Sequence, residues 1–81
     1  MARLIVQPVT VRVGPDGEPL AFHYRTWHVV GAILDSWREV GQWWDGESET
    51  VTYRVVTRSG GVFEVTHTPA QRRWVLYKAY D

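Results

Sequence analysis

The chain has 81 residues, no cysteine, and nine basic against nine acidic side chains. This length predicts one domain over residues 1–81, with a radius of gyration of about 12 Å. The lack of cysteine excludes disulfides and cysteine-based metal sites, and the neutral net charge argues against a protein that coats nucleic acid by bulk charge.

The sequence of the first third of the chain predicts two strands and a turn. Thirteen valines and seven threonines favour extended structure throughout, because branching at Cβ suits a pleated surface. Residues 9–13 alternate valine with polar residues, which predicts a strand with one solvated face. Residues 14–19 hold two glycines and two prolines and predict a turn. A second strand is expected over residues 21–27, with aromatic side chains on both faces.

The segment that follows is open to two interpretations. We favour a long strand over residues 28–38, bent by a bulge at Gly31 and Ala32. A short helix over residues 34–40 is the alternative, because four apolar residues fall at helical spacing: Ile33, Trp37, Val40 and Trp44.

The last third predicts three more strands. Residues 51–56 and 62–67 form a hairpin around a tight turn at 58–61, where adjacent glycines tolerate positive φ. After a turn at 68–71, a final strand over 74–80 should place Trp74 and Leu76 on one face and Ala79 on the other. Five to six short antiparallel strands predict an all-β fold, either a small curved sheet or an SH3-like or OB-like barrel.

The sequence shows no pattern typical of a catalyst. It lacks a nucleophile elbow and a phosphate loop, and its three histidines stand apart without a ligand spacing: His23, His28 and His67. We therefore expect no enzymatic activity, no metal and no cofactor. No stretch approaches the ~20 apolar residues of a membrane helix, and the first residues do not resemble a signal peptide. A cytoplasmic protein without membrane contact is expected.

The unusual feature is an excess of tryptophan and arginine, five and eight residues respectively. Much of it could serve core packing. Trp43 and Trp44 are adjacent, so they cannot point the same way in an extended chain, and either could be exposed. Tryptophan, tyrosine and arginine dominate protein interfaces and also stack on unpaired bases. The candidate binding surface consists of Trp43, Trp44, Tyr53, Arg54, Arg72, Arg73 and Trp74.

These residues also carry a family resemblance. Four features follow one another in the chain. They are a tryptophan pair within residues 37–47, a tyrosine-bearing strand at 51–55, a glycine turn at 60–61 and an Arg-Trp strand at 73–81 that ends in Tyr-Asp. This order resembles a small bacterial family of unknown function. It is also similar to the C-terminal module of the inactive Y-family polymerase homologue in bacterial mutagenesis cassettes. The likeness extends from about Leu20 onward, and residues 22–27 resemble free-standing members of the family.

The resemblance implies an adaptor and not a catalyst, because that C-terminal region is associated with recruiting partner proteins of translesion synthesis. We therefore expect a protein-interaction module that is accessory to DNA repair or translesion synthesis. Its expected partner is a protein, for example a polymerase or a repair factor. One alternative is the binding of single-stranded nucleic acid on a small barrel face. A second is self-association of exposed aromatic residues across a two-fold axis.

Overall fold

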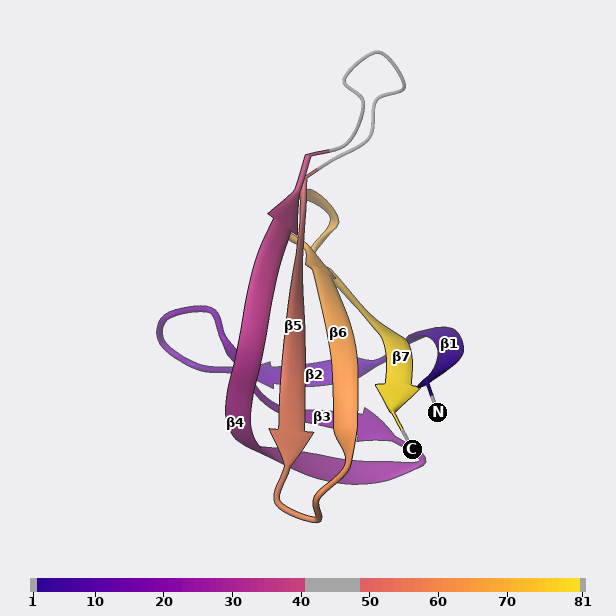
Figure 1. Ribbon diagram of the computed structural model, residues 1–81. Coiled ribbons are helices and arrows are strands. Elements are labelled where there is room, and N and C mark those ends of the chain that lie inside the picture. Colours follow the sequence, from indigo (N-terminus) through magenta and orange to yellow (C-terminus); the bar gives the residue numbers. More distant parts are fainter. Residues whose placement is uncertain (1, 41–48, 81) are drawn as a thin grey trace.

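The computed structural model describes residues 2–40 and 49–80. Within these residues it is all-β, with one short 3-10 helix, η2 (Pro69–Gln71), between the last two strands. The strands form one antiparallel, strongly curled sheet in the order β1-β7-β6-β5-β4-β3-β2 (Figure 1). In chain order they are β1 (Ala2–Pro8), β2 (Thr10–Val13), β3 (Pro19–Tyr24), β4 (Thr26–Glu39), β5 (Thr50–Thr57), β6 (Val62–Thr68) and β7 (Arg73–Tyr80). The predicted curved all-β sheet is confirmed.

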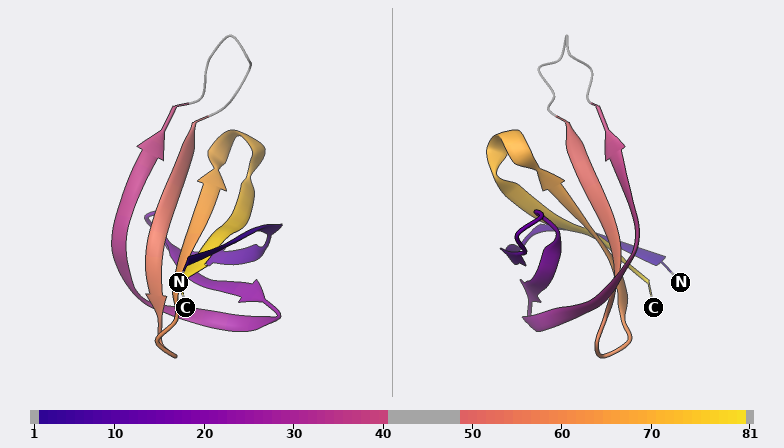
Figure 2. Two further views of the ribbon diagram at one scale, coloured as in Figure 1. Left: turned by 45° about the vertical axis from the view of Figure 1, so that its right-hand side comes forward. Right: turned by 90° about the vertical axis from the view of Figure 1, so that its left-hand side faces the viewer.

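The 14-residue strand β4 joins two layers of this sheet. Its first residues pair with β3, whereas residues 30–39 pair with β5. Register shifts between Val30 and Ala32 and between Ile33 and Asp35 bend the strand. As a result, β2, β3 and the start of β4 lie across one side of β5 to β7 (Figure 2).

The favoured interpretation of this segment is confirmed, including the bulge at Gly31 and Ala32. The alternative helix over residues 34–40 is wrong, because β4 continues in register with β5 to Glu39. The helical spacing of apolar residues was misleading. Ile33 pairs with Val55, and after the second register shift Trp37 pairs with Thr52. Val55 and Thr52 point to opposite faces of the sheet, so Ile33 and Trp37 do not share a face.

Seven strands replace the five to six that we expected. The additional strand is β1, which pairs with β7 at the edge of the sheet, where a proline is tolerated. The expected strand over residues 21–27 is divided, because Arg25 takes a left-handed φ of 66° and reverses the chain. Trp27 therefore belongs to β4 and lies opposite His23. The turns at 14–19, 58–61 and 68–71 occur where they were predicted.

The core lies between the two layers. It consists of buried side chains from β3, β5, β6 and β7: Phe22, Val55, Val65, Trp74 and Leu76. We call β2, β3 and the start of β4 the crossing layer. Phe22 on β3 contacts the Phe63 ring edge to face, with centroids 5.2 Å apart. Ala79 is also buried, at 2% exposure, on the face of Leu76. Our expectation that it faces the other way was wrong, because a register shift in the β6–β7 pair reverses the alternation.

No helix in the part of the chain that the structure describes has the length and hydropathy to cross a membrane.

Candidate binding groove on the outer face

We call the side of β4 to β7 that faces away from β2 and β3 the outer face. In Figure 1, β2 and β3 pass behind β5 and β6, so the outer face is turned toward the viewer. Register pairs place four of its residues in one row across the strands: Trp37, Thr52, Thr66 and Val75. Residues of the same strands one position away, such as Val65 and Leu76, point into the core.

A groove of about 340 Å³ lies on this face. Its floor is formed by Thr52 and Thr66, whose hydroxyl oxygens are 3.0 Å apart and hydrogen bonded. The walls are larger side chains from the flanking strands, Trp37 on β4 and Val75 and Tyr77 on β7. The groove exists because two short side chains on the central strands stand between aromatic side chains on their neighbours.

Two charged side chains from the described residues line the groove, and both are acidic. Glu39 lies at one end, opposite Thr50, at the last register pair of β4 and β5. Glu64 lies in the neighbouring row of β6 and is 3% exposed. Burial of a carboxylate costs free energy unless the group is paired and hydrogen bonded, so the surroundings of Glu64 decide whether it is tolerated.

Arg54 and Tyr80 satisfy Glu64. Arg54 Nη2 lies 3.3 Å from Glu64 Oε2, and the Tyr80 hydroxyl donates a hydrogen bond to the same oxygen. The guanidinium also lies over two rings, 5.3 Å from the centroid of Trp37 and 5.5 Å from that of Tyr80. Desolvation alone would lower the pKa of Arg54, but its hydrogen bonds and charge interactions with Glu64 and Tyr80 raise that pKa above its ordinary value.

Of the seven sequence-predicted residues, the structure describes five, and it does not gather these five into one surface. Arg54 belongs to the outer face, beside the groove. Tyr53 and Trp74 lie on the opposite, core-facing side, with ring centroids 5.9 Å apart, and Trp74 is 9% exposed. Arg72 and Arg73 are exposed at the start of β7, where Arg72 takes a left-handed φ of 49°. Trp43 and Trp44 lie outside the described residues.

Sequence reasoning missed most of the groove. The residues that line it come from four strands. The sequence pattern that could have indicated it is a polar residue at every second position of β5 and β6. Thr52 and Arg54 on β5 pair with Thr66 and Glu64 on β6 across the glycine turn. The contribution of Trp37 depends on the bulges of β4, which the sequence indicates only in part.

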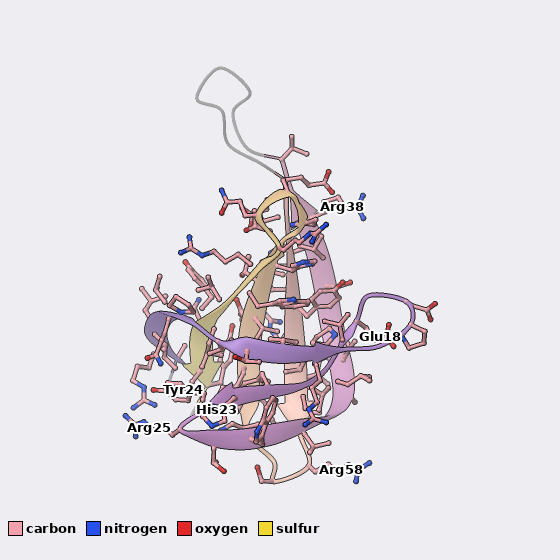
Figure 3. All side chains as sticks on the ribbon, turned by 180° about the vertical axis from the view of Figure 1, so that it is seen from behind. Glu18, His23, Tyr24, Arg25, Arg38 and Arg58 are labelled. Carbon is pink, nitrogen blue, oxygen red and sulfur yellow. The ribbon has the colours of Figure 1, made fainter. Side chains whose placement is uncertain are left out.

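A second tryptophan and arginine pair lies on the crossing layer. The Arg12 guanidinium is 5.0 Å from the ring centroid of Trp27, and His23 meets that ring edge to face at 5.4 Å. Trp27 is 43% exposed. Figure 3 shows this layer from behind, with His23, Tyr24 and Arg25 beside the turn between β3 and β4.

His67 stacks on the core tryptophan. Its ring lies parallel to that of Trp74, with centroids 4.2 Å apart. Partial burial lowers the pKa of His67 below its ordinary value of 6.5, because desolvation penalises the charged imidazolium. Among residues 2–40 and 49–80, no group of three His, Cys, Asp or Glu side chains is placed to hold a metal ion.

The described residues form a small curled β-sheet domain with a groove on its outer face. The chain belongs to a family described as a domain of unknown function (DUF6504), whose model matches residues 1–81. No curated protein and no solved structure matches the chain.

Proposed function

We propose that this domain is a protein-interaction module that binds an extended segment of its partner along the free edge of β4. One observation carries the proposal. β3 pairs with β4 only as far as Val29, and β5 pairs with the opposite edge of residues 30–39. The edge of residues 30–39 that continues past β3 therefore has no partner strand among the described residues.

An unpaired strand edge can bind a peptide in extended conformation. Backbone N–H and C=O groups along an unpaired strand accept an added strand, and side chains beside them provide specificity. Ile33 and Leu34 are 40% and 55% exposed at this edge and offer apolar contacts. The carboxylates of Glu39 and Glu64 in the adjacent groove disfavour a nucleic-acid strand, because its phosphates would be repelled.

The resemblance to the C-terminal module of the Y-family polymerase homologue supports a class of partner. It favours a role accessory to DNA repair or translesion synthesis, with a polymerase or repair factor supplying the segment. Purified Y-family polymerase homologue and replicative polymerase alpha subunit from the same bacterium are the first proteins to test.

Hydrogen exchange tests the proposal at the level of single amides. Binding of the partner should slow exchange over residues 30–39, and Leu34→Lys should weaken binding by about tenfold or more. Leu20→Lys is the matched control, because Leu20 is a similarly exposed strand residue at 47%. Partner binding without protection of β4, or equal losses in the two variants, would contradict the proposal.

The alternatives give different results in the same samples. Binding of single-stranded oligonucleotides would quench tryptophan fluorescence and weaken with added salt. Pairing of β4 with a second copy of the chain would protect the same amides without any partner and would give a concentration-dependent dimer in sedimentation.

A further inference from the structure

We infer that the outer-face groove receives a basic side chain, arginine in preference to lysine, from the partner's segment. The inference rests on the proposed function, because it assigns the cationic group to the segment that pairs with β4. It goes further by naming the chemistry that the partner must carry and the atoms that would recognise it.

The acidic lining of the groove favours a cationic group. Glu64 makes its bonds to Arg54 and Tyr80 through Oε2. Its other oxygen, Oε1, has no hydrogen bond to another described residue, and Glu64 lines the groove. A carboxylate oxygen in this position is an acceptor for a donor group, and a charged donor makes the strongest bond. Glu39 adds a second carboxylate at the other end.

The neighbouring cations do not occupy the groove. Arg54 is held against Glu64 Oε2 and the ring of Trp37, and Lys78 lies over the rings of Tyr77 and Tyr80 at 5.7 Å and 5.9 Å. Neither side chain is part of the lining.

The walls of the groove suit a guanidinium. Trp37 and Tyr77 present aromatic surface to either side of the threonine floor. Aromatic rings attract cations, and a planar guanidinium stacks on them better than a lysine ammonium does. The outer face already stabilises one guanidinium in this way, because Arg54 lies over Trp37 and Tyr80 while pairing with Glu64.

The groove is in reach of the free edge. Trp37 and Glu39 are residues of β4 that line the groove. In an added strand, every second side chain would point to the outer face, with its Cβ about 5 Å from that of its cross-strand neighbour. A long basic side chain at such a position would lie over Trp37 and extend toward the threonine floor.

Three capped five-residue peptides of alternating valine and threonine test the inference, with arginine, citrulline or glutamate at the centre. Citrulline keeps the shape of arginine and removes its charge. At roughly millimolar concentration the arginine peptide should shift the NMR signals of the Trp37 indole and of the Thr52 and Thr66 amides. The citrulline peptide should bind about tenfold more weakly, and the glutamate peptide should bind least.

Two variants with the same change in net charge locate the effect. Glu39→Gln should reduce the preference for arginine over citrulline by about threefold or more. Glu49→Gln should leave it unchanged, because Glu49 is paired with Arg38 at 2.8 Å and is not part of the groove. Both glutamates are exposed, so the fold should tolerate either change.

Equal binding of the arginine and citrulline peptides, or shifts confined to residues outside the groove, would overturn the inference. If the partner protein still protects β4 in that case, the proposed function stands without it. If the arginine peptide binds the groove but no partner protects β4, the proposed function fails and the groove remains a site for a guanidinium group.

Discussion

Two tryptophan and arginine pairs in the described part of the chain look alike at first and differ in what surrounds them. Arg54 lies 5.3 Å from the Trp37 ring on the outer face, and Arg12 lies 5.0 Å from the Trp27 ring on the crossing layer. Beside the first pair are a buried carboxylate, Glu64, and a groove. Beside the second pair is His23, which meets the exposed Trp27 edge to face.

Stacking of an arginine on a tryptophan therefore does not by itself define a binding site. An exposed arginine over a ring contributes little to stability and is common in proteins. At Trp37 the stacked Arg54 also pairs with the Glu64 carboxylate and donates a hydrogen bond to the Tyr80 hydroxyl, and these contacts hold it in one position. We therefore expect changes on the outer face to alter both stability and binding, and changes at Trp27 to alter neither strongly.

The largest expected effect concerns Trp74, which belongs to neither pair. Trp74→Ala should lower the free energy of unfolding by about 3–5 kcal/mol, because it empties a large volume in the core. Trp27→Ala should cost at most about 1 kcal/mol, since the residue is 43% exposed. Urea unfolding followed by circular dichroism measures both. Similar losses in the two variants would show that Trp74 does not have the core role that its burial indicates.

A smaller loss of unfolding free energy is expected when the buried carboxylate of Glu64 is removed. Glu64→Ala should cost about 2 kcal/mol, because the variant loses two hydrogen bonds in a buried position. Arg12→Ala, which removes only the exposed stack at Trp27, should change stability by less than about 1 kcal/mol. Thermal unfolding at one salt concentration compares them, and a larger loss in the Arg12 variant would reverse the proposed difference between the two faces.

The smallest expected effect is a pH dependence at His67. Its pKa is lowered in the folded state, so the unfolded state binds more protons between that value and 6.5. Its contribution to stability should therefore be fully present above pH 6.5 and be lost as the pH falls through 6.5 toward the lower, folded value. Urea midpoints of the wild type and of His67→Gln across this range should diverge on the acidic side. Parallel pH profiles would contradict the lowered pKa.

Local signals in the sequence predicted much of the fold. The alternation of residues 9–13, the glycine turn after β5 and the bulge at Gly31 each reflect short-range preferences, and the structure confirms them. β1 was missed because Pro8 interrupts its pattern, and its stability comes from pairing with β7 at the far end of the chain.

The candidate site was harder to predict, because residue type does not reveal which face of a strand is covered. Trp74 resembles an interface residue in the sequence, yet the crossing layer places it in the core. Trp37 and Tyr77 line the same groove although they come from strands that are not adjacent in the sheet. Their positions depend on register shifts in β4 and in the β6–β7 pair, which only long-range pairing determines.

The most direct test of the central claim is to titrate the arginine peptide into two variants, Trp37→Ala and Trp27→Ala, and follow the amide signals of Thr52 and Thr66. Trp37→Ala should remove the shifts, because it takes away one wall of the groove. Trp27→Ala should keep them, because Trp27 does not line the groove. Retained shifts in the Trp37 variant, or lost shifts in the Trp27 variant, would contradict the assignment of the groove as the site of recognition.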